Sequence, residues 1–125
     1  MTFLLVALCG GVGAMVRFIV DSLIKARWDS DFPAATVIIN VSGSYLIGLI
    51  TGATAFGGAQ SWHLFVAVGF CGGYTTFSAA MVETVRLIQA QRIRLAFLNA
   101  FGSLAMAIAA AIAGIATVAG VSALW

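Results

Sequence analysis

The sequence predicts an all-α membrane protein that crosses the bilayer four times. The chain of 125 residues is 62% hydrophobic and only 8% charged, and its mean hydropathy is +1.11. A water-soluble domain of this length could not bury so much apolar surface. The apolar residues also fall into four stretches of roughly 20 residues, the length that a helix needs to cross the hydrocarbon. We therefore expect residues 1–125 to form a single four-helix transmembrane domain.

The composition argues against several functional classes. The net charge of +2 is too small to indicate a nucleic-acid partner. The two cysteines, Cys9 and Cys71, lie inside apolar stretches, and we expect reduced thiols there and no disulfide. The sequence has no H-E-x-x-H motif, no nucleophile elbow, no phosphate-binding loop and no cluster of cysteine and histidine. We therefore expect a protein that is not an enzyme.

The first span is expected over residues 2–20, and its small residues offer a smooth face to another helix. Arg17 lies in its last turns, where a long side chain can reach the headgroups. A polar connection is expected over residues 21–32. Within it Asp21 and Lys25 have the i, i+4 spacing of an ion pair, which indicates a helix that continues on the membrane surface.

The second span is expected over residues 33–56, opened by Pro33 at a position where the missing N–H costs nothing. Thr36, Asn40 and Gly43 share one face of this helix because they are spaced by four and three residues. A tight, uncharged turn over residues 57–61 leads to the third span.

The third span, residues 62–88, contains a run of small and hydroxyl-bearing residues in its middle. The run is Gly69-Phe70-Cys71-Gly72-Gly73-Tyr74-Thr75-Thr76-Phe77-Ser78. Glycines and hydroxyl-bearing residues in succession predict a helix that is broken mid-membrane. Channels and transporters place ion sites at such breaks. Close packing against another membrane helix is the alternative reading of the glycine pair, and it stays open at this point.

Further polar residues lie near the end of the third span and in the fourth span. Glu83 and Arg86 are at i, i+3, which predicts a local ion pair. A short connection over residues 89–94 leads to the alanine-rich fourth span at residues 95–121. Asn99 and Ser103 lie on one face of it.

The membrane interior thus offers neutral hydrogen-bond donors and no lysine. A hydroxyl or an amide can replace water around a small anion without holding it as an ammonium group would. Conduction needs this compromise between entry and exit. The side chains in question are Thr36, Asn40, Thr75, Thr76, Ser78, Asn99 and Ser103.

Four motifs in register resemble the small fluoride channel family, called Fluc or CrcB, over essentially the whole chain. They are Gly10-Gly11-x-Gly13-Ala14-x-x-Arg17-Phe18, Pro33-x-x-Thr36-x-x-x-Asn40-x-x-Gly43, Gly69-x-x-Gly72-Gly73-x-Thr75-Thr76-Phe77-Ser78 with Glu83 following, and Gly102-Ser103.

The resemblance implies an antiparallel, dual-topology type of dimer with two narrow fluoride pathways. Such a channel would export fluoride passively across the plasma membrane, the inner membrane of the cell, and protect against fluoride toxicity. Asn40 would guard the pore, the ring edge of Phe77 would face fluoride, and Ser78 would continue a polar track. The candidate pathway residues are Thr36, Asn40, Phe77, Ser78, Asn99 and Ser103.

The resemblance also implies a structural sodium ion at the centre of the dimer interface. The backbone carbonyls of Gly72 and Thr75 would hold it, since carbonyl oxygens are suitable ligands for a hard cation. Arg17 matches an arginine of the vestibule, and a plain interfacial anchor is an equally good reading of it.

The chain departs from the family at one place. The family commonly has T-T-F-S-T-F, whereas this chain ends the motif with Ala79-Ala80, so the second ring is absent. Basic residues in the connections at residues 21–32 and 89–94 predict, by the positive-inside rule, cytoplasmic connections and external termini. The partner is therefore either a second copy or an oppositely oriented paralogous subunit that supplies the missing ring.

Two other functions fit the size of the chain. A small multidrug-type four-helix transporter would need a membrane-embedded glutamate in its first span, and residues 1–20 contain none. A non-transporting membrane assembly subunit would use its glycines for packing alone.

Overall fold

The computed structural model describes residues 1–58 and 60–125, in which every regular element is helical. The first two spans are the single helices α1 (Thr2–Arg27) and α2 (Ala34–Ala55). The third span consists of α3 (Gln60–Trp62), η1 (His63–Cys71), α4 (Gly72–Tyr74) and α5 (Phe77–Gln89). The fourth span consists of α6 (Ile93–Phe97), η2 (Leu98–Gly102) and α7 (Ser103–Ser122).

Four helical stretches in the described part of the chain are long and apolar enough to cross a membrane. This confirms the prediction of an all-helical protein with four spans. The predicted turn at residues 57–61 includes Ala59, which lies outside the described residues. Gly57, two residues before Ala59, has a φ of 105°, a conformation that glycine adopts without strain.

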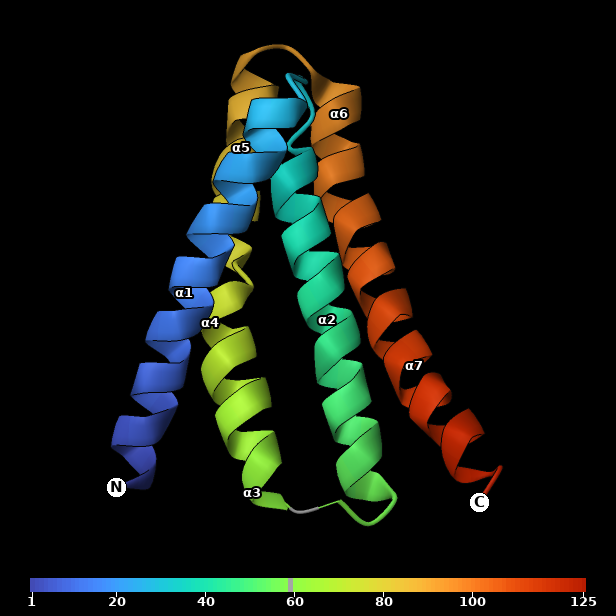
Figure 1. The fold of residues 1–125 in the computed structure, drawn as a ribbon. Helices are drawn as coiled ribbons and strands as arrows, with labels where there is room; N and C mark the ends of the chain where they lie inside the picture. The colour runs from blue at the N-terminus through green and yellow to red at the C-terminus, as the bar shows by residue number, and fades with distance from the viewer. Residues whose placement is uncertain (59) are drawn as a thin grey trace.

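The α1–α2 and α5–α6 connections lie at one end of the bundle, and both termini lie at the other end (Figure 1). An ion pair joins the two connections, with Arg92 Nη2 donating to Asp31 Oδ2 at 2.7 Å. Both side chains are well exposed, so the pair contributes little stability. It does place the two charged connections next to each other.

The helix α1 is longer than the expected first span, because it continues without a break to Arg27. Lys25 Nζ donates to Asp21 Oδ2 at 2.9 Å, which confirms the predicted pairing along this helix. The connection to α2 is therefore shorter than the expected residues 21–32 and begins only at Trp28.

Glycines allow two pairs of helices to approach closely. A Cβ atom at Gly13 would overlap the carbonyl of Phe70 in η1, so α1 packs backbone to backbone against the third span. A Cβ atom at Gly48 would overlap the carbonyl of Ala111, so α2 lies equally close to α7. Close backbone contact of this kind drives helix association in lipid, where the hydrophobic effect between helices is absent.

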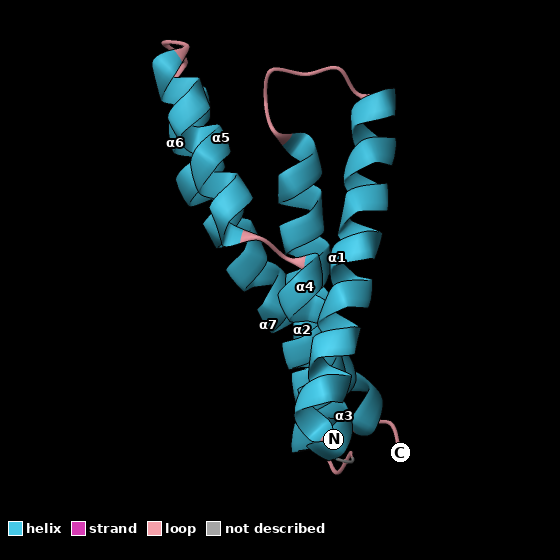
Figure 2. Cartoon of the chain, turned by 90° about the vertical axis from the view of Figure 1, so that its left-hand side faces the viewer, coloured by secondary structure: helices cyan, strands magenta, loops and turns pink. Residues whose placement is uncertain are grey.

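The two halves of the third span have different neighbours. The segments η1 and α4 pack against α1, whereas α5 packs against α6 and η2. Seen from the side, α5 and α6 lean away from α1 (Figure 2). The segment between α4 and α5 therefore joins a part packed against α1 to a part packed against the fourth span, and α2 contacts both parts.

Gly48→Ala should lower the thermal unfolding midpoint in detergent, because the added methyl overlaps the Ala111 carbonyl and forces α2 and α7 apart. Overpacking of this kind costs about 1–3 kcal/mol. Gly120→Ala in α7 is the matched control, since a Cβ atom there meets nothing within 4 Å. Equal midpoints for the two variants would contradict the close α2–α7 contact.

Candidate functional site

The regular helix of the third span stops at Tyr74 and resumes at Phe77. Between them Thr75 has φ −80° and ψ 157°, and Thr76 has φ −149° and ψ 115°, so both are extended. In a membrane each backbone N–H and C=O must find a partner within the protein, since lipid offers none. The Thr75 N–H still donates to the Cys71 carbonyl at 2.8 Å, whereas Thr76 needs hydrogen bonds from outside its own helix.

Asn40 of α2 supplies those bonds to Thr76. Its Nδ2 donates to the Thr76 carbonyl at 2.9 Å, and its Oδ1 accepts from the Thr76 N–H at 2.8 Å. An asparagine amide carries a donor and an acceptor side by side, so one side chain satisfies both backbone groups.

The two threonine hydroxyls form hydrogen bonds with backbone groups of the helices on either side. Thr75 Oγ1 donates to the Cys71 carbonyl at 2.8 Å, at the end of the helix before the interruption. Thr76 Oγ1 accepts from the Ala79 N–H at 3.3 Å and so caps the N-terminus of α5. The Thr76 hydroxyl thus explains where α5 starts, whereas a bond like that of Thr75 also occurs inside a continuous helix, as at Thr84.

The rearranged hydrogen bonds leave the Gly72 and Thr75 carbonyls, among others, without helical donors. In a continuous helix the Gly72 carbonyl would accept from the Thr76 N–H, and the Thr75 carbonyl from the Ala79 N–H. Here those N–H groups donate to Asn40 and to the Thr76 hydroxyl. Carbonyl oxygens without helical donors fit a hard cation, so the residues expected to bind sodium are suited to it. Two oxygens fill only part of a coordination shell.

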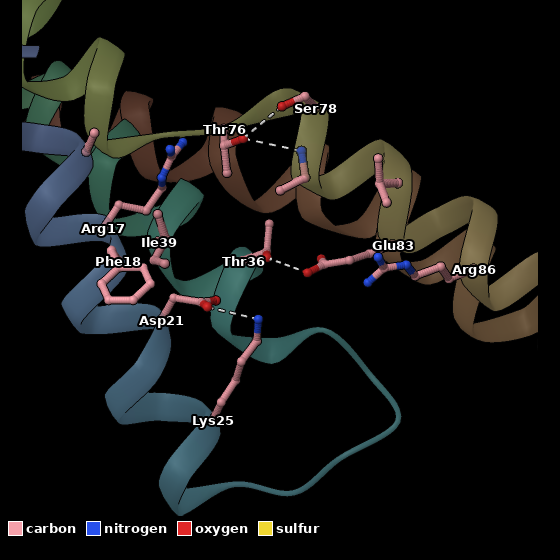
Figure 3. Close-up of a pocket in the computed structure, with 13 residues that line it drawn as sticks. Arg17, Phe18, Asp21, Lys25, Thr36, Ile39, Thr76, Ser78, Glu83 and Arg86 are labelled. Carbon is pink, nitrogen blue, oxygen red and sulfur yellow. Dashed lines mark hydrogen bonds and ion pairs between the residues drawn. The ribbon is translucent and has the colours of Figure 1, made fainter. Parts of the chain in front are cut away.

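A cavity of about 450 Å³ lies between α1, α2 and α5 (Figure 3). Three residues predicted from the sequence line it, namely Arg17, Thr36 and Ser78. Further charged side chains, Asp21, Lys25, Glu83 and Arg86, share its wall.

Glu83 is a site residue whose role was not predicted. Its Oε1 accepts a hydrogen bond from Thr36 Oγ1 at 2.9 Å, which links α5 to α2 across the first cavity. The predicted ion pair between Glu83 and Arg86 is wrong, since the ion pairs among the described residues are Asp21–Lys25 and Asp31–Arg92. Helical spacing indicated that Thr36 lies on the same face as Asn40, but it could not indicate which residue of the third span Thr36 would contact.

A second cavity, of about 260 Å³, lies on the other side of the interruption. Asn40, Phe77 and Ser103 line it, with Ser44 and several apolar side chains. Thr76 lines both cavities, so the extended segment forms the wall between them. Phe77 is 78% exposed and has little packing of its own within the subunit.

Asn99 is the one predicted pathway residue that the described linings of these two cavities do not include. It is fully buried, and its Nδ2 donates to the Ala80 carbonyl at 3.1 Å and to Thr84 Oγ1 at 2.9 Å. The Ser103 hydroxyl donates to the Asn99 carbonyl. Asn99 therefore lies behind the cavity wall and contacts the backbone of α5.

The fold and the site together define a class, a multi-pass membrane protein with polar cavities on both sides of a helix interruption. More narrowly, the chain belongs to the CrcB family. Its residues 4–115 match the family described as CrcB-like protein, Camphor Resistance (CrcB).

Curated relatives extend over nearly the whole chain. The chain is 47% identical over 120 residues to a Nitrobacter hamburgensis protein named fluoride-specific ion channel FluC 2, covering 94% of this chain and 97% of the relative. A Rhodopseudomonas palustris protein named fluoride-specific ion channel FluC is 45% identical over 120 residues, with the same coverage. A Listeria innocua protein named fluoride-specific ion channel FluC 1 is 46% identical over 85 residues, which are 68% of this chain and 70% of the relative.

Asn40→Ala should destabilise the protein by about 2 kcal/mol or more, because it leaves the N–H and the carbonyl of Thr76 without partners. The measurement is the thermal unfolding midpoint in detergent. Ser44→Ala, at another polar position lining the same cavity, is the control and should have a small effect. An unchanged midpoint for Asn40→Ala would mean that the amide does not hold the interruption.

Proposed function

We propose that the chain is a subunit of a fluoride-selective channel, which lets fluoride leave the cell passively across the plasma membrane and so protects it from fluoride toxicity. Similarity over nearly the full length to relatives named fluoride-specific ion channels supports this function. The structural observation that carries it is the position of Thr76 between a cavity rich in charged side chains and one lined by neutral groups.

The proposed pathway enters through the first cavity. Arg17 contributes positive charge at this vestibule, which raises the local concentration of anions. Thr36 lines the same cavity. Beyond it, Ser78 Oγ and Thr76 Oγ1 lie 3.3 Å apart and offer rotating hydroxyl donors in sequence. Neutral donors suit conduction, since they replace hydration water without trapping the ion.

The second cavity continues the pathway past Asn40, Phe77 and Ser103. One hydrogen of the Asn40 amide nitrogen is used on Thr76, and the nitrogen carries a second one that can serve an anion. The ring edge of Phe77 is positively polarised and so attracts an anion weakly. Chloride is larger and a weaker hydrogen-bond acceptor, which favours fluoride in a narrow path.

An antiparallel dimer would complete this arrangement. Phe77 and Ser78 are exposed on the outside of the subunit, and a Cβ atom at Gly72 would meet nothing within 4 Å. Polar groups and an interrupted backbone are costly to expose to lipid, so a second subunit on this face is favoured. A structural sodium ion held by the Gly72 and Thr75 carbonyls of both subunits would then fix the two interruptions against each other.

Ala80 bears on whether the partner is a second copy or a paralogous subunit. This residue is buried and lines the second cavity, at the position where the family commonly has its second phenylalanine. A homodimer would have one ring in each pathway. An antiparallel heterodimer with an oppositely oriented paralogous subunit would recover the second ring in one pathway. Numbered names such as FluC 1, FluC 2 and FluC 3 among the relatives are compatible with paralogous subunits.

The alternatives have less support. Membership of the CrcB family does not favour a multidrug-type transporter or a non-transporting assembly subunit. The family is a channel class, which agrees with the expectation that the chain is not an enzyme.

Protein reconstituted in liposomes, alone or with an oppositely oriented paralogue, should release fluoride down its gradient and retain chloride and a lipophilic cation. A fluoride-selective electrode measures the efflux. Phe77→Ile should reduce the efflux sharply, because an apolar wall replaces the ring edge. Phe101→Ile, at an exposed ring that lines neither cavity in the described residues, is the control. No fluoride efflux from the wild-type protein in either preparation would overturn the proposed function.

Gly72→Val should disrupt dimer assembly while the subunit still folds, since the open space around Gly72 would be filled by the partner. Thr75→Ser keeps the backbone carbonyl and the hydroxyl, and should leave the dimer intact. Gly120→Val, at another open glycine, controls for the added side chain. Size-exclusion chromatography with light scattering measures the assembly. Dimers of equal stability in all three variants would contradict a dimer interface at Gly72.

A further inference from the structure

The amide of Asn99 has no hydrogen left for an anion. Its two N–H donors are used on the Ala80 carbonyl and on Thr84 Oγ1, at 3.1 and 2.9 Å. Its Oδ1 is buried and has no hydrogen-bond partner among the described residues. An amide oxygen is an acceptor only and repels an anion. Direct coordination of fluoride by Asn99 is therefore incompatible with this arrangement.

Asn99 instead belongs to a triangle of hydrogen bonds around one backbone carbonyl. Thr84 Oγ1 donates to the Ala80 carbonyl at 2.8 Å and accepts from Asn99, which donates to the same carbonyl. Asn99 lies in η2, a stretch of wider π-helical turns. Such turns re-aim side chains within a helix and are frequent at functional sites.

The carbonyl held in this way lies in the first turn of α5, three residues after Phe77. The start of α5 is thus fastened on two sides, to α2 through Asn40 and Thr76, and to η2 through Asn99 and Ala80. Phe77 is largely exposed, so its position depends on the turn beneath it rather than on its own contacts.

We infer that Asn99 is a positioning residue of the fluoride pathway. It acts with Thr84 on the Ala80 carbonyl, and so determines where the ring of Phe77 and the hydroxyl of Ser78 lie. This inference rests on the proposed function, because its main consequence is a change in fluoride flux. It assigns a role in the pathway to Thr84, which lines neither cavity in the described residues.

The test is a double-mutant cycle with Asn99→Leu and Thr84→Val, measured as fluoride efflux per folded protein. Thr84→Val should reduce efflux about tenfold, the equivalent of one lost hydrogen bond. Thr84→Ser keeps the hydroxyl and should restore efflux to within about twofold. The double variant should be no slower than Asn99→Leu alone, since residues of one network are not additive.

Thr54→Val is the matched control for Thr84→Val. It also removes a hydroxyl that donates to the carbonyl four residues earlier, but in α2 and away from α5. If Asn99→Leu fails to fold, the two Thr84 variants carry the test. Wild-type efflux in Thr84→Val, or fully additive losses in the cycle, would overturn the inference. An inactive wild-type protein would overturn the proposed function itself.

A spectroscopic measurement separates positioning from a general loss of stability. Phe77 is replaced with 4-fluorophenylalanine by stop-codon suppression. The ¹⁹F resonance of this residue is recorded in detergent without fluoride. The resonance should shift or broaden in Thr84→Val and return in Thr84→Ser, while Thr54→Val leaves it in place. An unchanged resonance in Thr84→Val would show that the triangle does not position the ring.

Discussion

The two hydrogen bonds between the Asn40 amide and the backbone of Thr76 are the interaction on which the rest of the site depends. They satisfy both the N–H and the carbonyl of the extended residue Thr76 inside a membrane span, where an unpaired peptide group is costly. With this backbone fixed, the Gly72 and Thr75 carbonyls lose their helical donors and Thr76 stands between two cavities. A single side chain from the second span thereby determines the geometry of the third.

The interruption also divides the packing of the third span. The part before it lies against α1, and α5 lies against the fourth span, so neither neighbour holds both parts. Hydrogen bonds from α2 and η2 hold the start of α5 through Asn40 and Asn99, and Thr36 holds its middle through Glu83. Polar side chains thus do here what close glycine contacts do for the other helix pairs.

Much of this arrangement could be predicted from the sequence, because it depends on short-range rules. Length and hydropathy predicted four spans, and a helical spacing placed Thr36, Asn40 and Gly43 on one face, which does turn toward the third span. The partner of Glu83 and the burial of Asn99 could not be predicted in this way. They depend on how far one helix is shifted along and rotated against another, and the spacing within a single helix contains no information on that.

The one-sided distribution of charge affects how the chain enters the membrane. All six basic and all four acidic side chains lie within residues 17–31 and 83–94, in or near the half of the bundle where the α1–α2 and α5–α6 connections lie. Lys and Arg near the ends of membrane helices bias a chain towards the orientation that keeps them in the cytoplasm, whereas Asp and Glu contribute little. A copy whose termini cross the bilayer leaves both charged connections on the side of synthesis, whereas a copy inserted in reverse must carry the charged side chains of these connections through. The distribution of basic side chains therefore favours one orientation of the single chain over the other.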